Sequence, residues 1–170
     1  MSLLVSGTAF GEPSLQSLAE QVGSEDRKIM TDAISALASR TEPAALTILQ
    51  ALEADRLRVS PGAQILIEGE GGGLRDAISG KPVRAMSDLR KPLVTNSIRR
   101  SLRTAVARLE LRSPNRDVRL HASEVIASAV EQDMAPAVRA ALKAETDPEV
   151  HKSLALVLAQ IGRASCRERV

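Results

Sequence analysis

The fold is decided by residues 96–111, which read NSIRRSLRTAVARLEL. Apolar residues recur in this segment at three- and four-residue spacing, which is the period of one face of an α-helix. These apolar residues are Ile98, Leu102, Ala105, Val106 and Leu109. The arginines at positions 99, 100, 103 and 108 lie largely on the other faces. We therefore predict an amphipathic helix with a buried apolar stripe and a basic exposed side.

Further helices are predicted C-terminal to this segment, up to about residue 160. One runs through Ala122, the next begins near Pro136, and the last follows Pro148. An offset of 32 residues superposes residues 117–119 on residues 149–151, and the apolar positions that follow also coincide. A proline-containing turn followed by an apolar helix is typical of HEAT-like repeats, in which helix pairs stack. A non-repetitive helical bundle with the same helix starts is the alternative.

Residues 14–56 are predicted to form a helical hairpin, the unit of an α-solenoid. The first helix is expected to begin at Ser24, a good capping residue, and to bury one apolar face. That face contains Ile29, Ala33, Ile34, Leu37 and Ala38. A break at residues 40–43 precedes a second helix, which begins at Pro43 and has Leu46, Leu49 and Leu52 on its apolar face.

The helical period is lost between these two parts of the chain, over residues 57–86. Two short extended stretches flank Pro61 and Gly62, and residues 69–73 contain four glycines. This pattern predicts a small Gly-rich β-hairpin insertion. Helical periodicity is expected again from about Ser87. The predicted fold class is therefore mainly α, a HEAT-like helical repeat or α-solenoid with a β-hairpin insertion, and residues 87–160 form its second helical part.

Both ends of the chain differ in composition from the rest. Residues 1–13 are short and apolar, and we expect either the stub of a signal peptide or a disordered N-terminus. Residues 161–170 read IGRASCRERV. The codons ATC GGA AGA GCG TCG TGT AGG GAA AGA GTG encode this peptide and match a widely used sequencing adapter. We therefore expect residues 161–170 not to be native, and the helical pattern to end at Gln160.

Composition excludes several classes of protein. The chain has 170 residues with a hydrophobic fraction of 44%, enough to bury a core, and it lacks any apolar run long enough to span a membrane. We therefore expect this chain itself to be soluble. A single cysteine, Cys166, allows no internal disulfide. One phenylalanine and no tryptophan or tyrosine argue against modules that stack on bases, so no nucleic-acid partner is expected.

No catalytic, cofactor-binding or metal-binding motif is found in the sequence. A phosphate-binding loop that ends at Gly80 and Lys81 would need glycine at position 75 and a hydroxyl at position 82, where Arg75 and Pro82 stand. The two histidines, at positions 121 and 151, are too far apart for a metal-binding helix face. We therefore predict that the chain is not an enzyme and binds no cofactor or metal.

Charge is distributed unevenly along the chain. Residues 81–119, which we call the basic belt, carry 11 Lys and Arg against 3 Asp and Glu. Residues 1–80 carry 6 against 11, and residues 120–160 carry 3 against 6. Such a belt either attracts an anionic partner or pairs with the acidic segments on both sides. The candidate partner-binding residues are Arg99, Arg100 and Arg103.

Four segments occur in an order and spacing that resemble a known family. They are residues 74–83, 96–106, 113–122 and 145–150. They resemble the N-terminal extracytoplasmic region of urea ABC transporter permeases, within the branched-chain amino acid permease family. The resemblance covers roughly residues 14–160 and lies in order and spacing, not in one motif. In that family the region follows a signal peptide and precedes the membrane helices.

The resemblance implies a parent protein in the bacterial inner membrane, with this region outside the cytoplasm. It implies partners that act with the full-length protein: a second permease, ATPases and a solute-binding protein. Neither a complete signal peptide nor membrane helices are present in these 170 residues. The expected function is therefore that of an interaction or assembly domain of a urea transport system. The alternative is a stand-alone HEAT-like protein-interaction scaffold.

Overall fold

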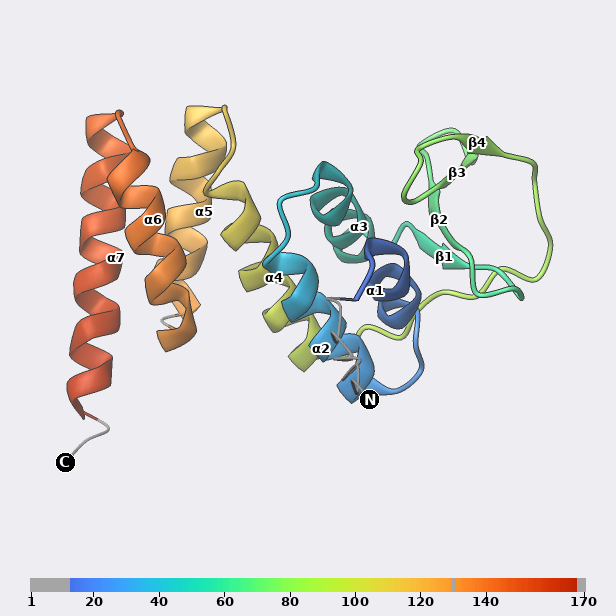
Figure 1. Cartoon of the computed structure of the whole chain (residues 1–170), viewed down its shortest axis with the longest axis horizontal. Helices are drawn as coiled ribbons and strands as arrows, with labels where there is room; N and C mark the ends of the chain where they lie inside the picture. Colours follow the sequence, from blue (N-terminus) through green and yellow to red (C-terminus); the bar gives the residue numbers. More distant parts are fainter. Residues whose placement is uncertain (1–12, 130, 168–170) are drawn as a thin grey trace, which may run out of the picture.

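The computed structural model describes residues 13–129 and 131–167, and for residues 165–167 only the backbone (Figure 1). The prediction for residues 1–13 thus falls almost wholly outside the described residues.

In these ranges the chain is mainly helical with one antiparallel sheet. The N-terminal helices are α1 Leu15–Val22, α2 Arg27–Ala38 and α3 Pro43–Glu53. The strands are β1 Leu57–Val59, β2 Ile65–Glu68, β3 Leu74–Asp76 and β4 Pro82–Val83. The C-terminal elements are α4 Asn96–Glu110, α5 Arg116–Ala129, the 3₁₀ helix η1 Gln132–Met134, α6 Ala135–Ala144 and α7 Pro148–Arg167.

Helix α4 joins the two hydrophobic cores of the molecule. Ile98 and Leu102 belong to a core formed with α1, α2, α3 and the sheet. Ala107 and Leu111 belong to a second core formed with α5, η1, α6 and α7. The amphipathic helix predicted over residues 96–111 is confirmed, and its stripe is buried except for the half-buried Leu109. This segment therefore supplies side chains to both halves of the fold.

Residues 13–56 contain three helices, so the hairpin predicted over residues 14–56 is wrong in helix number. Helix α1 was not predicted; it is short, and Ser14 caps it by accepting a hydrogen bond from the Ser17 N–H. Helix α2 begins at Arg27, not at Ser24, because the Asp26 carboxylate accepts hydrogen bonds from the N–H groups of the next turn. The Ser24 hydroxyl accepts from the Asp26 N–H and lies before the helix.

The start of α2 also changes which side chains face the core. Met30 is buried at 2% exposure, whereas Ile29, which was expected on the apolar face, is 43% exposed. The rest of the predicted face of α2 is buried, as are Leu49 and Leu52 on α3. Helix α3 begins at Pro43 as predicted.

The insertion is a four-stranded antiparallel sheet of order β1-β2-β3-β4, larger than the predicted hairpin. Strands β1 and β2 pair around the predicted turn at Pro61 and Gly62. The glycine segment connects β2 to β3, where the Gly69 N–H donates to the Gly73 carbonyl at 2.9 Å. Gly72 has φ +75°, a left-handed conformation that favours glycine. The glycines therefore form a tight connection that lets β3 return antiparallel beside β2.

The helix expected from Ser87 is absent, and α4 begins only at Asn96. Arg90 forms an isolated antiparallel bridge with Val59 of β1, so the backbone there is extended. Pro92 disfavours helical geometry at the residue before it. The Thr95 hydroxyl then caps α4 by accepting from the Ile98 N–H.

Gly23 marks the point where α1 meets the sheet. A β-carbon at this position would lie 2.8 Å from Ile65 Cδ1 and 2.9 Å from Val59 Cγ2. The Gly23 carbonyl also accepts a hydrogen bond from Arg90 Nη2 at 2.8 Å. The absence of a side chain at Gly23 thus lets the helix and the sheet approach closely.

Replacement of Gly23 by alanine is expected to lower the free energy of unfolding by about 1–3 kcal/mol, because the added methyl group overpacks the contact with the sheet. Chemical denaturation of the purified chain measures this change. Gly71→Ala is the matched control, since nothing lies within 4 Å of its added β-carbon. Gly71→Ala should be neutral or slightly stabilising, and an equal loss in both variants would contradict the close-approach explanation.

The C-terminal half contains α5, α6 and α7, close to the helix starts predicted from the sequence. Helices α5 and α7 pack against each other, and α6 packs on α7 (Figure 1). The predicted end of the helical pattern at Gln160 is wrong, because α7 continues to Arg167. Ile161 lies one turn after Val157 and is 3% exposed in the second core, which extends the apolar stripe of α7. The origin of residues 161–170 as a translated adapter stays a prediction.

Candidate functional site

The three predicted partner-binding arginines lie on α4, and all are exposed. Arg99 and Arg103 are four residues apart and share one face of the helix, and Arg100 lies beside them. Within the described part of the chain, none of the three guanidinium groups forms a hydrogen bond or an ion pair. We call these three residues the arginine face.

The other cations of the basic belt are largely paired. Five of the 11 form ion pairs, with acids contributed by both flanking segments. These pairs are Arg90–Glu25 at 3.5 Å, Lys91–Asp55 at 3.0 Å, Arg108–Asp133 at 3.9 Å, Arg119–Glu145 at 2.7 Å, and Arg116 with Asp117, Asp147 and Glu149. Part of the belt is thus neutralised inside the molecule. The arginine face belongs to the part that is not.

The carboxylates of Asp55, Glu53 and Glu110 lie near the arginine face without pairing with it. The pKa of the Asp55 carboxyl lies below its ordinary value, first because of the hydrogen bond from Lys91 and also because of the charges of Arg58 and Arg99. Arg103 lines a groove of about 360 Å³ together with Glu53, on α3, and His121, on α5. The arginine face therefore borders a surface where three helices meet.

The chemistry available to the arginine face is electrostatic. Exposed guanidinium groups donate hydrogen bonds to carboxylates or phosphates and are already positively charged at any physiological pH. His121 is exposed, and its Nδ1 lies 3.9 Å from the Glu124 carboxylate. Among residues 13–129 and 131–167, no three His, Cys, Asp or Glu side chains gather as metal ligands would. This surface is thus suited to binding an anionic group.

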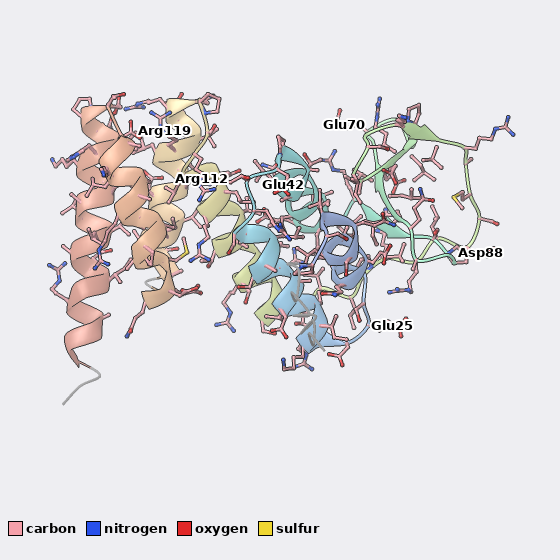
Figure 2. The ribbon with its side chains drawn as sticks, in the orientation of Figure 1. Glu25, Glu42, Glu70, Asp88, Arg112 and Arg119 are labelled. Atoms are coloured by element: carbon pink, nitrogen blue, oxygen red, sulfur yellow. The ribbon has the colours of Figure 1, made fainter. Side chains whose placement is uncertain are left out.

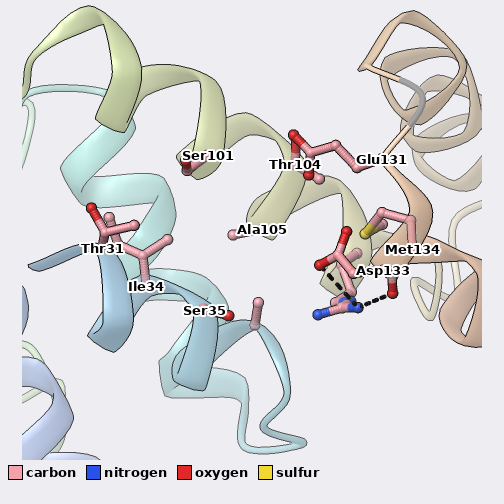
Figure 3. Close-up of a pocket in the computed structure, with 11 residues that line it drawn as sticks. Thr31, Ile34, Ser35, Ser101, Thr104, Ala105, Glu131, Asp133 and Met134 are labelled. Atoms are coloured by element: carbon pink, nitrogen blue, oxygen red, sulfur yellow. Dashed lines mark hydrogen bonds and ion pairs between the residues drawn. The ribbon is translucent and has the colours of Figure 1, made fainter. Parts of the chain in front are cut away.

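A second site was not found from the sequence. It is a cavity between α2, α4 and η1, lined by hydroxyl groups and by the acidic residues Glu131 and Asp133 (Figure 3). The spacing of Thr31 and Ser35 on α2, and of Ser101 and Thr104 on α4, was a signal that each helix carries polar residues on one face. Only the tertiary packing brings these two polar sides together with Glu131.

Comparison of the chain with known protein families, with characterised proteins and with solved structures identified no significant match. In the helices that the structure describes, none has both the length and the apolar character required to cross a lipid bilayer.

Proposed function

We propose that this chain is an extracytoplasmic, HEAT-like interaction domain of a urea ABC transporter permease, and that its arginine face binds an acidic surface of the solute-binding protein. The observation that carries the proposal is the set of exposed cations at Arg99, Arg100 and Arg103, which have no acidic partner in the described residues. The same belt pairs five of its other cations internally, and this cluster belongs to the part left available to another molecule.

The packing of the C-terminal helices supports the HEAT-like part of the proposal. Helices α4 and α5 pack as one pair and α6 and α7 as the next, with α5 against α7 (Figure 1). Helices α5 and α7 run in the same direction (Figure 1), and Ala122 and Leu154, 32 residues apart, are both in the second core. Stacked pairs of this kind give the extended surfaces that solenoid proteins use to bind partners.

The test is a binding titration between this chain and the cognate urea-binding protein. We expect binding that weakens as salt rises, because exposed charges are screened over about 8–10 Å at physiological ionic strength. The triple variant Arg99→Glu, Arg100→Glu, Arg103→Glu should weaken the affinity by at least about tenfold, the equivalent of about 1.4 kcal/mol.

A second triple variant provides the matched control. Arg139→Glu, Lys143→Glu and Lys152→Glu change the net charge equally at exposed positions of α6 and α7. This control should keep the affinity within about threefold, because rim charges away from the contact have small effects. Equal losses in both variants, or no binding at any salt, would contradict the proposed arginine face. Equal binding to unrelated acidic proteins would instead favour the stand-alone scaffold.

A further inference from the structure

The cavity between α2, α4 and η1 has a volume of about 170 Å³ and lies between the two hydrophobic cores (Figure 3). Ile34 and Ala105 belong to the first core, whereas Met134 belongs to the second. Met134 is 1% exposed, so it holds η1 in place beside the cavity. The lining of this cavity therefore comes from both halves of the molecule.

Most hydroxyl groups around the cavity have already donated their protons. Thr31 Oγ1 donates to the Arg27 carbonyl at 2.8 Å, and Ser101 Oγ donates to the Ser97 carbonyl at 3.4 Å. A hydroxyl group has one proton and two acceptor lone pairs, so these oxygens can only accept further hydrogen bonds. Ser35, at the rim, is the one lining hydroxyl with no hydrogen bond among the described residues. The polar wall therefore offers mainly acceptors.

Glu131 is a half-buried carboxylate at this wall that lacks a cationic partner within the described residues. Of the described groups, only Thr104 Oγ1 donates to its Oε1, at 3.4 Å, and Thr104 shares the same proton with the Arg100 carbonyl at 3.3 Å. A carboxylate can accept about four hydrogen bonds. Glu131 thus has acceptor capacity that the protein itself leaves largely unused.

Among the described residues, Arg108 is the cation that lines the cavity, and it is already engaged. Its Nη2 donates to the Asp133 carbonyl at 2.7 Å and lies 3.9 Å from the Asp133 carboxylate. Figure 3 shows these two contacts on the side of the cavity away from Thr31. Arg108 and Asp133 neutralise each other, so the lining keeps the single negative charge of Glu131.

We propose that this cavity binds a guanidinium group, with Glu131 as its counter-ion and the hydroxyl oxygen of Ser101 as a further acceptor. A guanidinium is planar and cationic, and it carries N–H donors around its edge and no acceptor, which complements this wall. The group can come from a free small molecule or from an arginine side chain of a partner. The inference is independent of the transporter assignment, because it rests only on the cavity.

Titration calorimetry of the whole chain with methylguanidinium, at constant ionic strength, tests the proposal. We expect saturable binding and a rise in Tm, because a ligand between the two cores stabilises the folded state by mass action. Urea has N–H donors without the charge, and tetramethylammonium has the charge without N–H donors. Both should bind at least about tenfold more weakly, since charge-assisted hydrogen bonds need both properties. Equal binding of either compound overturns the proposal.

Two variants test the residues, and circular dichroism verifies that each is folded. Glu131→Gln should weaken methylguanidinium binding by about tenfold, the loss expected for one charge-assisted hydrogen bond. Ser101→Met should fill the cavity and abolish binding. Glu124→Gln, at an exposed site on α5, is the matched control and should leave binding unchanged. Unchanged binding in Glu131→Gln overturns the proposal, as does unchanged binding in Ser101→Met.

The peptide Gly-Arg-Gly distinguishes the two sources of the guanidinium group. Saturable binding of the peptide, lost in Glu131→Gln, supports an arginine side chain of a partner. Binding of methylguanidinium without the peptide supports a free small molecule. Binding of neither compound overturns the proposal.

Discussion

Replacing Leu102 with alanine is expected to lower the free energy of unfolding by about 2–5 kcal/mol, the range observed for truncation of a fully buried leucine. Leu102 is 0% exposed in the middle of α4, and α4 packs on α2, α3 and α5. The loss would remove a large part of a total stability of about 5–15 kcal/mol. Because α4 supplies both cores, we expect the two halves to unfold in one transition at lower denaturant.

The measurement is urea denaturation followed by circular dichroism, and Leu156→Ala is its control. Leu156 lies on α7, also inside a helix, but its side chain is 57% exposed. The control should change stability by no more than about 0.5 kcal/mol. Similar losses of unfolding free energy in the two variants would contradict the central position of Leu102 in the core.

A second large loss of stability is expected when Glu145 is replaced. Glu145 lies between α6 and α7, and Arg119 ties it to α5. Arg119 Nε donates to Glu145 Oε2 at 2.7 Å, and Arg119 Nη2 donates to Oε1 at 2.8 Å. The side chain of Glu145 is only 3% exposed. Arg119, labelled in Figure 2, also donates to the carbonyls of Ser113 and Pro114. The pair therefore ties the α4–α5 connection to the α6–α7 connection.

Glu145→Gln is expected to destabilise the chain by about 1.5–3 kcal/mol, the contribution of hydrogen bonds that involve charged groups. A neutral amide keeps the shape of the side chain, but it replaces one acceptor oxygen by a donor that faces the Arg119 guanidinium. Thermal unfolding at pH 7 measures the change. An unaltered Tm would contradict a structural role for this ion pair.

The lowered pKa of the Glu145 carboxyl makes the stability of the chain depend on pH. The hydrogen bonds from Arg119, and then those from the Asp147 and Thr146 N–H groups, lower the pKa of Glu145 from 4.5 to about 2. A pKa lowered in the folded state gives stability that is present above pH 4.5 and is lost as the pH falls toward 2.

The pH profile of the original chain should therefore fall more steeply between pH 4.5 and 2 than that of Glu145→Gln. The pKa values of Asp55, Asp76 and Asp147 are lowered as well, so both profiles fall, and only their difference reports Glu145. Glu124→Gln, where the side chain is 65% exposed, should follow the original profile. Parallel profiles for the original chain and Glu145→Gln would contradict the lowered pKa.

Several elements could be predicted because their signals are local. The apolar period of residues 96–111 and the position of Pro43 are contained in neighbouring residues, and α4 and α3 begin where these signals place them. Helix α1 was missed because it has only eight residues, too few for a clear period. The strands β3 and β4 were missed because each contains only two or three residues, and such short strands form only where an existing strand edge offers a partner.

The candidate sites were likewise predictable from the sequence only where their signals are local. The unbalanced charge of residues 81–119 was visible in the sequence, and so were Arg99, Arg100 and Arg103. Which cations of the belt are neutralised was not visible, because Arg90 pairs with Glu25 and Arg119 with Glu145 across long stretches of chain. The cavity beside Glu131 had no complete local signal, since its walls come from three separate elements.

The sequence by itself determined the helical class of the chain, the start of most helices and the place of the β insertion, because periodicity, caps and prolines act over a few residues. The tertiary structure alone decided the number of strands, the extension of α7 through Ile161, the pairing of the basic belt and the polar cavity. These features depend on which surfaces meet in space, and the free energy of burial and ion pairing is realised only when they do.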